Sequence, residues 1–120
     1  MSIPNDYREI VLMLIDKTDR GLVHWRKDKF GIVVSVDSSR FSIWGGNDEH
    51  SEEPFVAFGL HDGPGNTIDS WYVEENEGSD YNLMHRLYQG AKRYANGVPE
   101  KLKFLKDKIA TSEEIGKPSE

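Results

Sequence analysis

Four histidines and one acidic segment are the groups in this chain whose residue types suggest metal chemistry. No two of the histidines have the i, i+3 or i+4 spacing that would place two ligands on one face of a helix. The acidic segment 48–53 lacks the alternating ligands and the fixed glycine of a calcium-binding loop. We therefore predict no metal and no cofactor, and we interpret residues 48–53 as an exposed hairpin tip. The four histidines are His24, His50, His61 and His85.

Motifs for nucleophilic catalysis are also missing from the sequence. The chain has no cysteine, which excludes thiolate chemistry and disulfide bonds, and it has no Gly-x-Ser-x-Gly elbow. Carboxylates are abundant in the predicted loops, so a hydrolase that uses a pair of them is one alternative. Abundance does not place two carboxylates in one cleft, however, and the sequence favours a non-catalytic protein.

The large aromatic residues suggest binding rather than catalysis. Across residues 30–43, apolar side chains occupy every second position of two predicted strands, as they do in strands with one buried face. If these side chains face the helices, then Val33, Trp44 and either Trp71 or Tyr72 face the other way. An antiparallel sheet can leave that face open to water, and an exposed apolar patch is typical of a contact with a partner. Alternatively, a helix covers this face and the tryptophans belong to the core.

The predicted patch combines three apolar residues with two charged residues at its rim, and we expect it to bind a partner protein or a second copy of the chain. The net charge is −6, from 21 acidic and 15 basic residues. This charge favours a basic partner through electrostatic steering and argues against nucleic acid as a ligand. The predicted partner-binding residues are Val33, Trp44, Trp71, Arg40 and Asp69.

A small-ligand-binding or sensor module is a second interpretation of the same aromatic residues. In this alternative, a pocket lies between the helices and the sheet, and Trp25, Tyr72 and Tyr88 line it. A cavity with converging polar groups would favour it over the interaction module, whereas a solid core would remove it.

The spacing of hydrophobic residues predicts three helices and four or five strands. Apolar residues recur with helical periodicity over residues 7–15, 83–95 and 102–109, whereas the segment between the first two alternates with period two. Short connections between the strands favour an antiparallel meander. We therefore predict an α+β fold in which an N-terminal helix and a C-terminal helical hairpin pack on an antiparallel β-meander. The apolar stripes of all three helices need cover, and the sheet is the surface that can supply it.

The sequence also predicts one domain and no membrane contact. We expect residues 1–110 to form a single domain and the polar residues 111–120 to be a disordered tail. Residues 1–9 lack the basic start of a signal peptide, and no apolar run approaches the roughly 20 residues of a membrane span. We therefore expect a cytoplasmic protein.

The order of the predicted elements and two motifs resemble a loose class of small, uncharacterised bacterial and phage proteins. These proteins share an N-terminal amphipathic helix, a Lys-Thr-x-x-Gly-x-x-x-Trp segment, a β-meander and a helix of the Leu-x-x-Leu-Tyr-x-x-Ala-Arg type. The first motif corresponds to residues 17–25 and the second to residues 84–93, and the resemblance covers most of residues 6–110. It implies a bacterial or phage cytoplasmic setting, and it transfers no catalytic residue.

Overall fold

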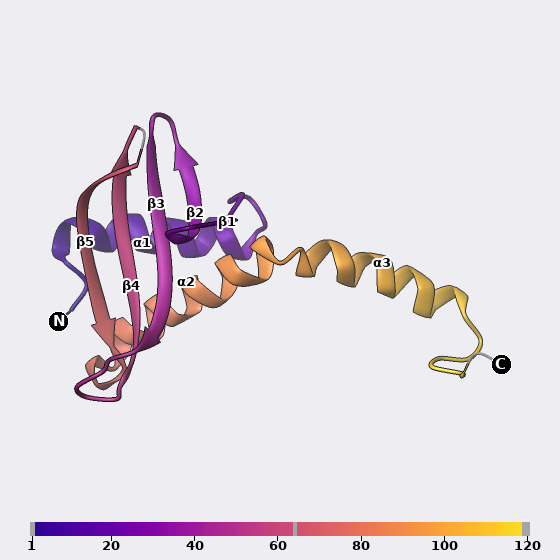
Figure 1. The fold of residues 1–120 in the computed structure, drawn as a ribbon. Helices are drawn as coiled ribbons and strands as arrows, with labels where there is room; N and C mark the ends of the chain where they lie inside the picture. The colour runs from indigo at the N-terminus through magenta and orange to yellow at the C-terminus, as the bar shows by residue number, and fades with distance from the viewer. Residues whose placement is uncertain (1, 64, 119–120) are drawn as a thin grey trace.

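The computed structural model describes residues 2–63 and 65–118, and it confirms the predicted α+β class. An N-terminal helix precedes five antiparallel strands, and two helices follow them (Figure 1). The elements in chain order are α1 (Asn5–Asp19), β1 (Arg26–Asp28), β2 (Gly31–Val36), β3 (Ser39–Asn47), β4 (Pro54–Asp62), β5 (Asn66–Glu74), the 3-10 helix η1 (Glu75–Glu77), α2 (Ser79–Ala95) and α3 (Val98–Thr111).

The five strands form one meander, in which each strand pairs with the next along the chain. Strands β3 and β4 pair over their full nine residues, and the segment 48–53 connects them. The pairing of β4 with β5 contains one register shift, between Leu60 and His61. Because side chains alternate between the two faces of a strand, this pairing decides which residues share a face.

Helices α1 and α2 pack on one face of the sheet, which we call the helix-facing side (Figure 1). Helix α1 buries Tyr7, Val11 and Ile15, which recur every fourth residue as the sequence predicts. The centre of the core is the fully buried ring of Phe58, whose centroid lies 5.4 Å from that of Trp71 and 6.0 Å from that of Tyr7.

The two helices approach each other closely because Gly90 has no side chain. A Cβ atom at this position would lie 2.9 Å from Cγ2 of Thr18 on α1, a distance that real Cβ atoms essentially never show. Gly90 is less favourable in a helix than alanine by about 1 kcal/mol, and the close approach of α1 accounts for its presence.

Asp80 ties the N-terminal segment to the start of α2. Its carboxylate accepts a hydrogen bond from the backbone N–H of Ile3 at 3.0 Å, and its two oxygens accept from Nη2 of Arg8 at 3.0 and 2.9 Å. Burial alone would raise the pKa of Asp80, but these hydrogen bonds outweigh burial and lower it. The group therefore stays ionised and holds the first residues against the helix pair.

Helix α3 extends away from the sheet instead of folding back on it (Figure 1). None of its residues is buried, although Leu102, Phe104 and Ile109 are large and apolar. The two C-terminal helices of the predicted fold are thus present, with α2 packed on the sheet and α3 continuing beyond it (Figure 1).

Residues 112–118, which follow α3, are exposed. They have no helix or strand, and residues 119–120 of the predicted tail lie outside the described residues. The first residue of that predicted tail, Thr111, is the last residue of α3. Within residues 2–63 and 65–118, no helix is both long and apolar enough to cross a lipid bilayer.

The position of Phe58 predicts a large effect of its removal on stability. The Phe58→Ala variant should lose about 3–5 kcal/mol of unfolding free energy, because the substitution leaves a cavity between Tyr7 and Trp71. The matched control is Phe104→Ala on α3, where 53% of the side chain is exposed and the loss should stay within about 0.5 kcal/mol. Urea unfolding of both variants in dilute solution measures the difference, and similar losses would contradict the assigned core.

Candidate functional site

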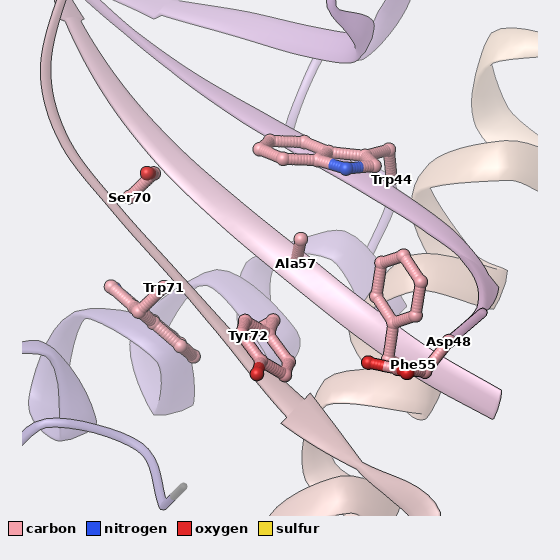
Figure 2. A pocket seen from close by; sticks show the side chains of 7 residues that line it. All are labelled: Trp44, Asp48, Phe55, Ala57, Ser70, Trp71 and Tyr72. Carbon is pink, nitrogen blue, oxygen red and sulfur yellow. The ribbon is translucent and has the colours of Figure 1, made fainter. Parts of the chain in front are cut away.

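The face of the sheet opposite α1 and α2 carries a row of aromatic and small side chains. Trp44 pairs with Ala57 across β3 and β4, and Ala57 pairs with Tyr72 across β4 and β5. These three residues lie side by side on what we call the open face, with Ala57 between the two aromatic rings (Figure 2). Phe55 lies beside Tyr72, with 5.9 Å between the ring centroids and an edge-to-face geometry.

These side chains enclose a depression of about 400 Å³, which we call the aromatic slot. Its floor is formed by Ala57, and its size lies in the range that accommodates a few apolar side chains of a ligand. Trp44 is half-buried, and Tyr72 keeps 40% of its surface exposed. The slot is lined by Trp44, Asp48, Phe55, Ala57, Ser70, Trp71 and Tyr72.

Two glycines make room for the aromatic walls of the slot. Gly31 has φ +110°, and a Cβ there would lie 3.0 Å from Cβ of Trp44. A Cβ at Gly46 would lie 3.3 Å from the ring of Phe55. Larger residues at these two positions would therefore push the rings out of their places, and Gly31 also supplies a backbone conformation that other residues rarely adopt.

A second depression, of about 450 Å³, continues from the slot across the open face. The two share Trp44 and Ser70 and so form one groove. The ring of Phe30 closes the second depression by stacking on His61, with centroids 4.8 Å apart. Lys29 and Thr67 also line this part of the groove.

A buried hydrogen-bonded network lies beneath the groove. The Oγ atom of Ser42 is 2.6 Å from Nε2 of His61, and Nδ1 of His61 is 3.2 Å from Oγ1 of Thr67. A Cβ at Gly59 would lie 2.7 Å from Oγ of Ser42 and 2.9 Å from Nε2 of His61, so this position needs glycine. The network links β3, β4 and β5 by side chains in addition to the backbone ladder.

The chemistry of this network is structural rather than catalytic. Ser42 has no exposed surface, and His61 is 3% exposed. Burial lowers the pKa of His61, and the nearby positive charge of Arg40 lowers it further. The imidazole is therefore kept neutral and hydrogen-bonded, and the serine hydroxyl is out of reach of a substrate.

One carboxylate, that of Asp48, lines the slot. Asp48 accepts hydrogen bonds from the backbone N–H groups of Ser51 at 3.1 Å and His50 at 2.8 Å, and these bonds lower its pKa. The hydroxyl of Ser51 donates to Oε2 of Glu74 at 2.8 Å, which joins the β3–β4 hairpin to the end of β5. Asp48 thus stays ionised at the edge of an apolar depression.

Three of the five predicted partner-binding residues lie on the open face, and two do not. Trp44 forms a wall of the slot, while Val33 lies beneath the surface with 0% exposure. Arg40 is half-buried on this face and pairs with Asp28. Trp71, which is 6% exposed, packs in the core, and Asp69 is on the same helix-facing side.

Tyr72 rather than Trp71 is therefore the β5 aromatic residue on the open face. The pairing of Trp71 with Phe58 places both rings on the helix-facing side. Asp69 accepts a hydrogen bond from the hydroxyl of Tyr7 at 2.9 Å. Burial first, and then this carboxylate, raise the pKa of Tyr7 to about 12. Asp69 thus connects β5 to α1 and does not contribute to the rim of the groove.

The three aromatic residues of the small-ligand alternative are not brought together in one pocket. Tyr72 lies on the open face, Trp25 is buried in the core with its indole N–H bonded to Thr18 at 3.0 Å, and Tyr88 packs against Gly45. Among the described residues, no group of three or more histidines and acidic residues could hold a metal ion.

A search of protein-family models, a search of curated proteins and a search of solved structures found no match to the chain.

The lowered pKa of His61 predicts how stability depends on pH. In the unfolded chain, His61 takes up a proton near its ordinary pKa of 6.5, whereas the folded protein resists this protonation. The contribution of the neutral imidazole to the unfolding free energy should therefore be fully present above about pH 7.5 and be lost as the pH falls through and below 6.5. The His61→Gln variant should show a shallower decline, measured by urea unfolding across this range.

The matched control for this experiment is His50→Gln, at the exposed tip of the β3–β4 hairpin. This variant should keep the pH dependence of the original chain. An unchanged slope in His61→Gln would show that protonation of the buried network does not affect folding.

Proposed function

We propose that this protein is a non-catalytic interaction protein that binds an apolar and basic segment of a protein partner in the aromatic slot. The observation that carries the proposal is the open face itself, where Trp44, Phe55 and Tyr72 surround a depression of about 400 Å³ that α1 and α2 leave uncovered. Aromatic residues that surround a depression are typical of the centres of protein interfaces.

The construction of the slot supports binding of apolar side chains. Ala57 is small, so the rings of Trp44 and Tyr72 stand higher than the floor between them (Figure 2). Both rings are anchored at their base by the sheet, and they therefore lose little conformational freedom when a ligand binds. Leucine or isoleucine side chains from a partner would fill the space and remove the exposed ring surfaces from water.

The charge at the edge of the slot supports a basic partner. Asp48 lines the slot and is held ionised by two backbone N–H groups, and Glu74 is fixed nearby through Ser51. Lysine or arginine residues that flank an apolar stripe would reach these carboxylates while the stripe occupies the slot. Such pairs at the rim add orientation and association rate more than affinity.

The state of the histidine and carboxylate groups favours binding over catalysis. His61 and Ser42 are bonded to each other below the surface of the groove. The pKa of Asp48, the carboxylate that lines the slot, is lowered by its backbone hydrogen bonds, which suits an ionised binding group rather than a general acid at this position. These observations support an interaction protein over the carboxylate hydrolase considered from the sequence.

Selection of peptides from a random display library tests the proposal. Peptides that bind the full chain should contain two or more large apolar residues with lysine or arginine beside them. The double variant Trp44→Ala, Tyr72→Ala should weaken their binding by about thirty-fold or more, which corresponds to the roughly 2 kcal/mol of an interface hot spot.

The matched control is Ile68→Ala, an exposed apolar residue of the same strand as Tyr72 that does not line the slot. Binding to this variant should be unchanged. Peptides that bind the double variant as tightly as the original chain would contradict the slot as the binding site, as would a library that yields no binders.

A further inference from the structure

Helix α3 presents an apolar stripe to solvent, and this stripe has the chemistry that the slot requires. Leu102, Leu105 and Ile109 follow each other at spacings of three and four residues, which places them on one face of the helix. Their exposed fractions are 51%, 40% and 56%. A chain that leaves such a stripe uncovered loses the favourable free energy of burying it, so the stripe is a contact surface without its partner.

Lysines flank this stripe on both sides. Successive residues of a helix are separated by about 100° of rotation, so Lys101 and Lys108 fall on one side of the stripe and Lys106 on the other. Lys101 and Lys108 also lie over the ring of Phe104, at 5.7 and 5.6 Å from its centroid. The acidic residues of α3, Glu100 and Asp107, lie on the opposite face of the helix.

The charge of α3 is opposite to that of the rest of the folded chain. Residues 98–111 contain four lysines and two acidic residues, whereas residues 1–97 contain ten basic and sixteen acidic residues. Two copies of α3 would place lysines against lysines if their stripes paired directly, which is unfavourable. The complementary surface is therefore an apolar depression with an acidic edge, and the aromatic slot with Asp48 has this combination.

Helix α3 does not reach the slot of its own chain in this structure. It follows α2, which lies on the helix-facing side, and it points away from the sheet (Figure 1). Its 14 residues span about 21 Å. Gly97, with φ +71°, separates it from α2 and sets its direction. The slot of a second copy is not limited by this connection between α2 and α3.

We propose that α3 of one copy docks in the aromatic slot of a second copy, and that the second copy returns the same contact to form a closed dimer. This inference rests on the proposed function of the slot, because it names the segment that fills it. Leu102, Leu105 and Ile109 insert between Trp44 and Tyr72, and the flanking lysines face the carboxylate edge. In this dimer each α3, which we call the arm, lies in the slot of the other copy, so both arms and both slots are filled. One-sided contacts would instead produce open chains.

Analytical ultracentrifugation of the full chain tests this dimer. The original chain should form a dimer that weakens as salt increases, because the lysine and carboxylate pairs are exposed to solvent. Leu105→Glu on the arm and Trp44→Ala in the slot should each raise the dimer dissociation constant by about ten-fold or more. The matched control is Met13→Glu, at a position 53% exposed on α1, and it should leave the dimer unchanged.

Mixing the two variants provides a second, sharper test. Leu105→Glu retains an intact slot, and Trp44→Ala retains an intact arm, so a mixture can form one of the two contacts. The mixture should contain heterodimers at concentrations where each variant alone is a monomer. A dimer formed by any other surface would not be restored by mixing.

Three results would overturn the inference. The first is an original chain that stays monomeric up to its limit of solubility, and the second is a dimer that Leu105→Glu does not weaken. The third is binding of the monomer to vesicles of anionic phospholipid that is lost on Lys106→Glu, which would assign the arm to a lipid surface.

If Trp44→Ala abolishes selected peptide binding while Leu105→Glu leaves the dimer intact, the inference fails and the proposed function stands. If Trp44→Ala changes neither peptide binding nor dimer formation, the dimer inference and the proposed function both fail.

Discussion

The structure depends on one constraint, which is that two helices cover only one face of a five-stranded sheet. Burial of Phe58, Trp71 and the apolar sides of α1 and α2 supplies the core on that face. Among the described residues, no helix packs on the other face, and its exposure is limited by its own side chains and by Phe30, which stacks on His61. These side chains include the buried pair of Ser42 and His61 and small residues that leave a groove between aromatic rings.

The charges of the molecule are separated as well. Helix α2 begins beside the acidic end of the sheet and runs to the base of α3, which is basic. Helix α3 projects outward with its lysines and its apolar stripe exposed. An acidic aromatic slot and a basic apolar arm thus coexist in one chain and on different sides of it. This separation is the physical basis for proposing that the two meet between copies.

The sequence predicted the elements better than it predicted their faces. Alternation over residues 30–43 identified two strands and correctly placed Val33 and Trp44 opposite the core, because each strand has only two faces. For β5, alternation alone left Trp71 and Tyr72 equivalent, and only the pairing of Trp71 with Phe58 distinguishes them. The contact between Ser42 and His61 likewise depends on how β3 and β4 pair, and the spacing of the two residues in the sequence does not reveal it. The stripe of α3 was visible in the sequence, but the pattern does not say which surface covers it.

The accessibility of the three tryptophan side chains tests the central claim most directly. In the Leu105→Glu chain, whose arm cannot cover the groove, a soluble paramagnetic agent should broaden the indole N–H signal of Trp44 in NMR spectra. It should leave the signals of Trp25 and Trp71, which are 2% and 6% exposed, nearly unchanged. Equal protection of all three signals would contradict an open face, and selective broadening of Trp71 would reverse the assignment of the two sides of the sheet.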